Sequence, residues 1–231
     1  MPQEYKVKVL SVKDLGDGFW SGKLERPEGF EYIAGQYVSI LVDRVSRQRR
    51  SYSLASYPDL DYLELAVDTA PMGVGSRFLL SLKAGDGVEI LGPLGRFTVQ
   101  DSTKNKTFLG TGCGVVPLRS QIHDLLKNRE FKERVELQWG MRHERDVFWK
   151  PEFEQLEKEF PNFHFDLVLS KPGADWAGCK GHLQDCLIKH GLDLSGWEAY
   201  LCGNSEMIND MADRLVSNGV KSEEVYQEKF S

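Results

Sequence analysis

Short runs of alternating apolar and polar residues dominate the first hundred positions of the chain. Glycine, proline and aspartate interrupt these runs at close intervals, and this density of short strands is typical of a small antiparallel barrel or sandwich. One helix is expected in this part, over residues 75–82. The expected strands lie in the segments YKVKVLSVKDL, SGKLERPEG, QYVSILV, RSYSLAS, YLELAVDT, DGVEILGPLG and RFTV.

After the polar stretch 101–105 the pattern changes to apolar strands that alternate with amphipathic helices. The expected strands are KTFLG, RVELQWG, NFHFDLVLS, WEAYLCG and VYQEKF, and the expected helices are VPLRSQIHDLLKNREF, PEFEQLEKEF, KGHLQDCLIKHG and SEMINDMADRLVSNG. Repeated strand–helix units predict a parallel sheet with helices on both faces, whose ligands bind at the carboxyl ends of the strands. We therefore expect an antiparallel β-barrel domain over residues 1–101, followed by an α/β parallel-sheet domain over residues 102–231.

Composition narrows the class of protein. Of the 231 residues, 41% are hydrophobic and 28% are charged, and the net charge of -6 gives no support for nucleic acid or an anionic membrane as a partner. Because the chain contains no run of 18 apolar residues and its N-terminus lacks the apolar core of a signal peptide, we expect a cytoplasmic protein. The irregular spacing of the cysteines predicts no metal, no iron–sulfur cluster and no disulfide. The cysteines are Cys113, Cys179, Cys186 and Cys202.

A guanidinium, an aromatic ring and a hydroxyl follow one another in the expected strand RSYSL. Side chains of a strand alternate, so Arg50 and Tyr52 project to one face and Ser53 to the other. Arginine can hold a phosphate with its planar fork, tyrosine can stack on a heteroaromatic ring, and serine can hydrogen-bond a ring nitrogen. These groups suit a flat cofactor that carries phosphates, although an ordinary half-exposed strand could have the same sequence.

Two glycine-rich segments each precede an expected helix. Gly110–Pro117 follows the first strand of the second half, where glycines let the backbone approach a diphosphate and the helix N-terminus offers free N–H groups. Met72–Ser76 precedes the only expected helix of the barrel and offers a second anion site, with a glycine hinge capped by Ser76 as the alternative. Two such sites would suit two dinucleotides, one on the barrel and one on the sheet.

Two more groups stand at the ends of expected strands. Cys202 and Gly203 end the fourth parallel strand, where the glycine would let a flat ring lie close to the thiol. No basic neighbour activates this thiol, so we interpret it as a positioning group, with an ordinary buried cysteine as the alternative. A closing strand would carry Glu228 and Phe230 to the same end of the sheet, unless the C-terminus is frayed.

In this order, RSYS, GVGS, ILGPLGRF, GTGCGVVP, LCGN and EKF resemble the ferredoxin–NADP⁺ reductase superfamily, over nearly the whole chain from about Tyr5 to Phe230. The resemblance implies an FAD-binding barrel, an NAD(P)-binding α/β domain, and a hydride-transfer cluster of Ser53, Cys202 and Glu228. It assigns FAD contacts to Arg50, Tyr52, Ser53, Leu54, Ala66, Val67, Asp68, Gly73, Val74, Gly75, Ser76 and Phe230. It assigns contacts with NADPH or NADH to Thr111, Gly112, Cys113, Pro117, Arg142, Ser170, Lys171, Lys180, Cys202 and Gly203.

The choice of nicotinamide depends on recognition of a 2′-phosphate. The plant-type pattern has Ser-Arg after the third parallel strand and ends on a tyrosine, whereas this chain has Ser170-Lys171 and ends on Phe230-Ser231. Lys171 and Lys180 would meet a 2′-phosphate as point charges, which favours NADPH. The segment LVLSKPGADWAG also resembles NADH-using members of the superfamily.

The resemblance implies an FAD-dependent oxidoreductase that transfers hydride from NAD(P)H to FAD and single electrons, reversibly, to a ferredoxin or flavodoxin. The cysteines do not have the spacing of a fused ferredoxin, so the acceptor is expected to be a separate protein. A basic cluster could dock an acidic acceptor, and it consists of Arg44, Arg47, Arg49 and Arg50. The alternatives are an NADH-dependent reductase component of a multicomponent oxygenase, a free-flavin reductase, and a nucleotide-binding regulatory module without enzymatic activity.

Overall fold

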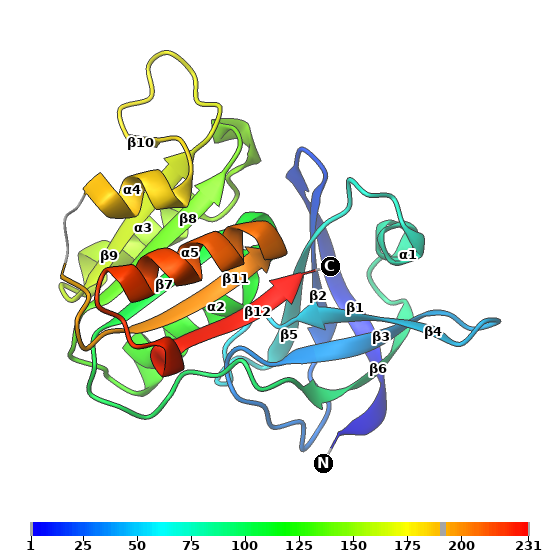
Figure 1. The fold of residues 1–231 in the computed structure, drawn as a ribbon. Helices are drawn as coiled ribbons and strands as arrows, with labels where there is room; N and C mark the ends of the chain where they lie inside the picture. Colours follow the sequence, from blue (N-terminus) through cyan, green and yellow to red (C-terminus); the bar gives the residue numbers. More distant parts are fainter. Residues whose placement is uncertain (1, 190–192, 231) are drawn as a thin grey trace. The chain divides into compact units, whose positions relative to one another are not determined.

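A computed structural model describes residues 2–189 and 193–230 of the chain (Figure 1). The chain divides into two compact units. The first unit is the chain up to Val99 together with Arg119–Asn128, and the second unit is Gln100–Leu118 together with the chain from Arg129 onward. A short segment from the middle of the sequence therefore packs with the N-terminal part of the chain.

Antiparallel strands build the first unit. They are β1 (Gln3–Gly16), β2 (Phe19–Glu25), β3 (Tyr37–Asp43), β4 (Gln48–Ser53), β5 (Tyr62–Asp68) and β6 (Gly87–Leu94). Their order in the sheet is β4-β3-β6-β1-β2-β5, and helix α1 (Val74–Ser81) connects β5 to β6. Alternate side chains such as Val38, Ile40 and Ile90 are fully buried in the core, as the period-two pattern predicts. The expected antiparallel domain is confirmed.

The strand expected over residues 96–99 is wrong, because residues 95–99 form no strand. Phe97 and Val99 are buried, which explains the strand-like pattern of the segment. The carbonyl of Phe97 accepts a hydrogen bond of 2.6 Å from the Nε2 of Gln121, so its partner is a side chain of a helix and not a neighbouring strand.

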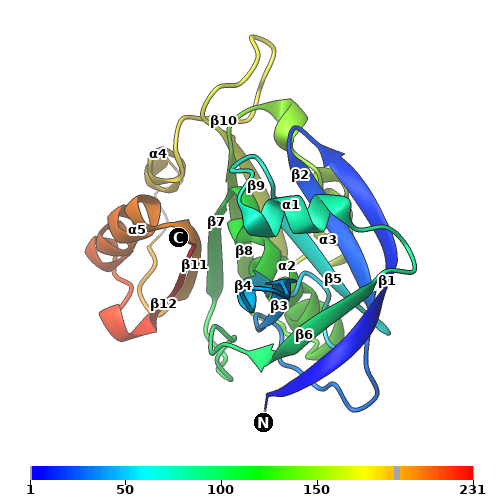
Figure 2. The ribbon, with the colours of Figure 1, turned by 90° about the vertical axis from the view of Figure 1, so that its right-hand side faces the viewer.

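Parallel strands build the second unit. They are β7 (Lys106–Thr111), β8 (Val135–Met141), β9 (Phe163–Leu169), β10 (Cys179–Lys180), β11 (Glu198–Asn204) and β12 (Val225–Phe230). The helices of this part of the chain are α2 (Val115–His123), α3 (Lys150–Glu159), α4 (Leu183–Lys189) and α5 (Ser205–Ser217), with short helical turns at η1 (Gly112–Gly114), η2 (Asp124–Asn128), η3 (Glu144–Asp146) and η4 (Ser222–Glu224). The second half of α2 and all of η2 pack with the first unit. Helices α4 and α5 lie on one face of the sheet and α3 on the other (Figure 2). The expected parallel α/β architecture is confirmed.

The order of strands in this sheet is β10-β9-β8-β7-β11-β12. The chain runs outward from β7 through β8 and β9 to β10, and then returns to β11 on the other side of β7. At such a reversal the loops after the two neighbouring strands diverge, and ligands of parallel sheets bind in the crevice that this divergence leaves. Gly110 of β7 and Cys202 of β11 lie in register beside this point.

Different side chains fill the two faces of the parallel sheet. On the α3 face, the Phe153 ring lies between the rings of Trp139 and Phe165, with centroid distances of 6.0 and 5.2 Å. On the opposite face, an apolar cluster that includes Leu109 and Leu201 packs against α4 and α5. No helix in the described part of the chain is long and apolar enough to cross a membrane.

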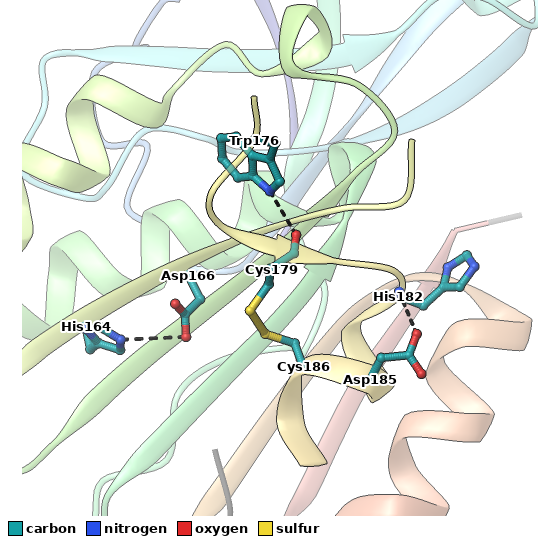
Figure 3. Close-up of a disulfide and its surroundings, with 7 residues drawn as sticks. All are labelled: His164, Asp166, Trp176, Cys179, His182, Asp185 and Cys186. Atoms are coloured by element: carbon teal, nitrogen blue, oxygen red, sulfur yellow. Dashed lines mark hydrogen bonds and ion pairs between the residues drawn. A yellow bond between two sulfur atoms is a disulfide. The ribbon is translucent and has the colours of Figure 1, made fainter. Parts of the chain in front are cut away.

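A disulfide contradicts the expectation that the cysteines stay unpaired. Cys179 of β10 is bonded to Cys186 of α4 (Figure 3). The chain reverses at Gly181, whose φ of +111° is easily adopted only by glycine, so α4 returns over the strand that precedes it. The helix expected from Lys180 begins instead at Leu183, and its expected last residues, 190 and 191, lie outside the described residues.

Candidate functional site

The turn after β7, residues Thr111–Gly114, is packed against the end of β11; we call it the glycine turn. A Cβ on Gly114 would lie 2.0 Å from the carbonyl oxygen of Cys202, and a Cβ on Gly203 would lie 2.3 Å from Oγ1 of Thr111. Real Cβ atoms do not come so close to other atoms, so only glycine fits at either position. The two segments that the sequence singled out separately are therefore in direct contact.

The outer side of the glycine turn is open. Gly112 has a φ of +55°, and a Cβ built on it would meet nothing within 4 Å. Its carbonyl is fixed from behind by the buried indole of Trp139, whose Nε1 donates a hydrogen bond of 3.0 Å. The first turn of α2, which follows at Val115, carries no acidic side chain. A partly exposed glycine turn before a helix N-terminus without acids is the arrangement that favours a bound phosphate.

The thiol of Cys202 lies beneath this turn and is fully buried. Burial raises its pKa well above the usual value, and the nearby Glu228 and Cys113 raise it further. The thiol is therefore neutral at physiological pH, which agrees with a positioning group and not with a nucleophile. Strand β12 places Glu228 in register with Cys202, and Phe230 in register with Asn204.

Backbone hydrogen bonds join the loops that follow β8 and β9. The amide of Ser170 donates to the carbonyl of Met141 at 3.0 Å, and the amide of Lys171 donates to the carbonyl of Arg142 at 2.8 Å. Nδ1 of His143 lies 2.9 Å from the carbonyl oxygen of Lys171. These contacts bring Arg142, Ser170 and Lys171 together at the carboxyl ends of β8 and β9.

Lys180 lies at the same end of the sheet, because it pairs in register with Leu169 at the end of β9. We call Arg142, Lys171 and Lys180 the cation cluster. All three residues are exposed, and within the described ranges none has a carboxylate partner within 4.0 Å. The cluster therefore offers positive charge that the protein itself does not neutralise.

In the first unit, β4 meets the start of α1. A Cβ on Gly75 would lie 2.4 Å from the hydroxyl oxygen of Tyr52 and 3.2 Å from Cγ of Arg50, so both side chains reach the first turn of the helix. Burial raises the pKa of Tyr52 to about 12, although Arg50 opposes the shift. The N-cap of α1 is Gly73, which has no side-chain cap and open space around it; the alternative in which Ser76 caps the helix is wrong.

The remaining predicted residues of the first unit lie on β4 and β5. Ser53 ends β4 and is 8% exposed, and the amide of Leu54 donates to the carbonyl of Gln36 at 3.0 Å. On β5, Ala66 is buried and Asp68 is exposed. Ser53 belongs to the first unit whereas Cys202 and Glu228 belong to the second, so the cluster of these three residues stays a prediction.

Comparisons with known proteins find one family model in each half of the chain. A family model described as an oxidoreductase FAD-binding domain matches residues 19–99, and one described as an oxidoreductase NAD-binding domain matches residues 108–213. The structure of the Amycolatopsis cytochrome P450 reductase GcoB superposes with a TM-score of 0.92 at 31% identity, over 99% of this chain and 70% of that chain. The chain belongs to the ferredoxin–NADP⁺ reductase superfamily.

Other members of the superfamily are similar over most of this chain. One component of the Na(+)-translocating NADH-quinone reductase of Neisseria meningitidis is 33% identical over 216 residues, which are 87% of this chain and 53% of that protein. The chain thus spans about half the length of the curated relatives it matches. A ferredoxin NADP+ reductase from Neisseria gonorrhoeae, with bound FAD and NADP, has the same fold with a TM-score of 0.85, at 22% identity and 98% coverage of both chains.

As a member of the superfamily, the chain is an oxidoreductase that uses FAD and a nicotinamide dinucleotide. The residues of each unit fit these cofactors. The uncapped start of α1, beside Arg50 and Tyr52, offers N–H groups and a guanidinium to the FAD diphosphate and a ring to its flavin. The open glycine turn offers the same backbone groups to the diphosphate of the nicotinamide dinucleotide.

The basic cluster expected to dock an acidic acceptor is partly neutralised within the reductase. Arg44 pairs with Glu89 at 3.3 Å, and Arg49 pairs with Glu4. Arg47 turns the hairpin with a φ of +57°. Half of the cluster is therefore engaged in surface ion pairs, which weakens the sequence argument for a docking surface here.

Sequence reasoning missed two buried side chains, one that holds the glycine turn and one in the core of the first unit. Trp139 is the donor that holds the glycine turn, and its only signal was a tryptophan late in an apolar strand. Arg119 was assigned to an ordinary helix, yet it packs in the first unit, where it donates to the carbonyl of Ala55 at 2.7 Å and pairs with Glu64 at 3.2 Å. Charge in the middle of a helix normally indicates exposure, so no pattern in the sequence pointed to this buried pair.

Proposed function

We propose that this reductase oxidises NADPH or NADH and passes the electrons, through FAD, to a separate one-electron acceptor protein, a ferredoxin or a flavodoxin. The observation that carries the proposal is the contact between the glycine turn and the end of β11. There an open backbone suited to a diphosphate adjoins a neutral, buried thiol. A bound flavin accepts a hydride from the nicotinamide and can release its electrons singly, which is chemistry that the side chains alone do not supply.

The residues of the first unit hold and orient FAD. Arg50 is exposed and its Cγ lies beside the first turn of α1, so its fork, which donates to the carbonyl of Arg49 at 2.8 Å, can turn to grip the diphosphate together with the amides that follow Gly73. Tyr52 is half-buried, and its raised pKa keeps the hydroxyl neutral, so the ring can pack on the flavin without placing an anion beside it.

The residues of the second unit hold and orient the nicotinamide dinucleotide. The amides of the glycine turn bind its diphosphate. Gly203, which has a φ of +151°, lets the end of β11 pack directly against Oγ1 of Thr111 and so holds the glycine turn in place. The Cys202 thiol lies beneath this turn, and because it stays protonated it adds no charge that would compete with hydride transfer.

Ser53 and Glu228 complete the proposed hydride-transfer cluster. Direct transfer from nicotinamide to flavin needs no base to abstract a proton, so these residues act through position. Ser53 would hold N5 of a bound flavin by a hydrogen bond, and Glu228, in register with Cys202, would support the protonation of that atom. Phe230 supplies an exposed ring two residues further along β12.

The cation cluster favours NADPH over NADH. Three exposed cations without carboxylate partners at the ends of β8, β9 and β10 suit the two negative charges of a 2′-phosphate. The names of the relatives favour NADH, since several are components of NADH-quinone reductases. Steady-state kinetics with both dinucleotides decide between the two: NADPH preference appears as a lower KM with an unchanged kcat.

A second candidate function is a reductase component that serves an oxygenase. The sequence identity of 31% to a cytochrome P450 reductase, over 99% of this chain, favours this second function. In either function the hydride enters in the same way, and only the acceptor differs. The cytoplasmic location also stays a prediction.

The acceptor is identified by competition. FAD-loaded protein is reduced with NADPH or NADH and offered a ferredoxin, a flavodoxin, free flavin and a soluble quinone in parallel assays. We expect the fastest turnover with an iron–sulfur or flavin protein. Turnover of free flavin alone would assign the chain to the free-flavin reductases, and no oxidation of either dinucleotide would refute the proposed function.

A further inference from the structure

One covalent link lies at the edge of the parallel sheet. Figure 3 shows the bond between Cys179 and Cys186, which crosses from strand β10 to helix α4. Cys186 is 1% exposed and belongs to the apolar cluster formed with α5 and β11, and Cys179 packs against the same cluster from a half-buried position. The bond therefore fastens an edge strand to the core of the second unit.

Few other contacts hold this strand in place. Strand β10 pairs with β9 over two positions only, and the amide of Gly181 adds one hydrogen bond of 2.9 Å to the carbonyl of Leu169. The indole of Trp176 donates to the carbonyl of Cys179 at 3.0 Å (Figure 3). Most of the preceding segment, residues 171–178, is exposed. Strands this short and segments with so few buried contacts open locally, so the disulfide is a main constraint on β10.

The constraint acts directly on the cation cluster. Lys180 follows Cys179 in the chain, and Lys171 stands at the other end of the exposed segment. As long as β10 stays on β9, Lys180 remains beside the end of β9, where Lys171 is anchored by its bond to the Arg142 carbonyl. If the disulfide is reduced, Cys179 no longer holds β10 on β9, and Lys180 can move away from Lys171.

We propose that Cys179 and Cys186 form a reversible thiol-redox site that controls the affinity of the reductase for the 2′-phosphate of NADPH. In the disulfide form the cation cluster is held together and binds the phosphate. In the dithiol form β10 leaves the sheet more often and the cluster loses Lys180. The effect on NADPH rests on the proposed function of the cation cluster, whereas the redox site itself does not.

The chemistry is ordinary thiol–disulfide exchange with a dithiol reductant. One thiolate of the reductant attacks the sulfur of Cys179, which is the more exposed of the two residues, and the Cys186 sulfur leaves with the bonding electrons and takes up a proton. The second thiol of the reductant then attacks the mixed disulfide, which releases Cys179 as a thiol and closes the disulfide of the reductant. Two electrons and two protons pass to the pair.

The remaining cysteines do not share this reactivity. Cys202 is fully buried and its pKa is raised, so it offers almost no thiolate. Cys113 sits in the glycine turn, away from the disulfide. Exchange with an external dithiol is therefore directed to the pair at the sheet edge.

The redox site is tested first without reference to activity. The holoenzyme is equilibrated with oxidised or reduced dithiothreitol, denatured in the presence of an alkylating reagent, and analysed by intact mass and peptide mapping. We expect two alkylated cysteines, Cys113 and Cys202, in the oxidised sample and all four in the reduced sample. Full alkylation of Cys179 and Cys186 after oxidation would overturn the proposal.

The effect on the dinucleotide site is tested on the same two samples. We expect faster hydrogen exchange of residues 171–182 after reduction, a several-fold higher KM for NADPH, and an unchanged kcat and KM for NADH. The double variant C179S/C186S serves as the control, and it should show the high KM under both conditions. If exchange and KM are the same in both samples, the control by the pair is refuted even though NADPH oxidation stands. If neither dinucleotide is oxidised, the proposed function fails, and the hydrogen exchange still decides whether the pair holds β10.

Discussion

Replacing Gly114 by alanine tests the contact on which the dinucleotide site is built. The added Cβ would lie 2.0 Å from the carbonyl oxygen of Cys202 and 2.9 Å from the amide nitrogen of Gly203. Both neighbours are backbone atoms of a central strand, so neither can rotate away. A relaxed carbon–oxygen contact needs about 3.3 Å, and the glycine turn and β11 must therefore separate by about 1.3 Å.

The cost of this displacement follows from overpacking. Inserting a methyl group into closely packed structure costs about 1–3 kcal/mol. If the turn moves and β11 stays, that cost appears as lost affinity for the dinucleotide, about fivefold to 150-fold. A shift of this size at a positioning segment also slows the chemical step, by about 100-fold for each ångström of misplacement.

The assay is calorimetric titration of the FAD-loaded variant with NADP⁺ and NAD⁺, followed by stopped-flow reduction with NADPH. Gly196→Ala is the control, because Gly196 belongs to the second unit and a Cβ there meets nothing within 4 Å, so only its φ of +79° opposes a side chain. The control should lose some stability and keep its affinity for the dinucleotide. A folded Gly114→Ala protein that binds both dinucleotides within twofold of the wild type would show that the contact between the glycine turn and β11 does not shape the dinucleotide site.

Three further predictions concern single side chains. Lys171→Ala should raise the KM for NADPH about fivefold and leave the KM for NADH unchanged, since one exposed charge contact is worth about 1 kcal/mol. The control is Lys150→Ala, because the charge of Lys150 already faces Glu154 at 3.5 Å. Equal effects of Lys171→Ala on both dinucleotides would contradict the role of Lys171. Tyr52→Ala should weaken FAD binding about 30-fold, because about 2 kcal/mol of ring packing is lost. The Tyr52→Phe variant keeps the ring and should bind FAD as the wild type does. A flavin titration that shows no difference between the two variants would argue against ring packing. The raised pKa of Cys202 means that the thiol keeps its proton in the folded chain, whereas the unfolded chain releases it above about pH 8.5. The free energy of unfolding should therefore fall as the pH rises, by up to about 1.4 kcal/mol per pH unit. Urea titrations at pH 7.5 and 9.5 measure this fall, which should be smaller in Cys202→Ala; equal falls in both proteins would rule out Cys202 as its source.

Much of the fold was predictable because hydrophobic periodicity reports burial. The period-two runs of the first unit and the strand–helix alternation of the second each place apolar side chains on a face that must be covered. The terminal strand was predictable for the same reason, and the register of β12 then brings Glu228 opposite Cys202. Residues 96–99 were misassigned because burial alone does not distinguish a strand from an extended segment that hydrogen-bonds a helix side chain.

The parts that could not be predicted depend on contacts that are distant in sequence. A spacing of seven residues does not show that Cys179 and Cys186 meet, because their contact requires the reversal at Gly181. Likewise, the buried pair of Arg119 and Glu64 joins residues 55 positions apart. The functional motifs were recognisable individually, whereas the absence of space between Gly114 and Cys202 became visible only in the structure.

The proposed function requires that a nicotinamide bound by the second unit transfers hydride directly to a flavin bound by the first. Anaerobic stopped-flow reduction of the FAD-loaded protein measures this transfer. The reductants are NADPH and NADH in which deuterium replaces one or the other of the two hydrogens on C4 of the nicotinamide. Direct transfer predicts that the flavin absorbance bleaches with a primary isotope effect for one of the two C4 hydrogens only. Bleaching without an isotope effect at either position, or no bleaching with either dinucleotide, would contradict it.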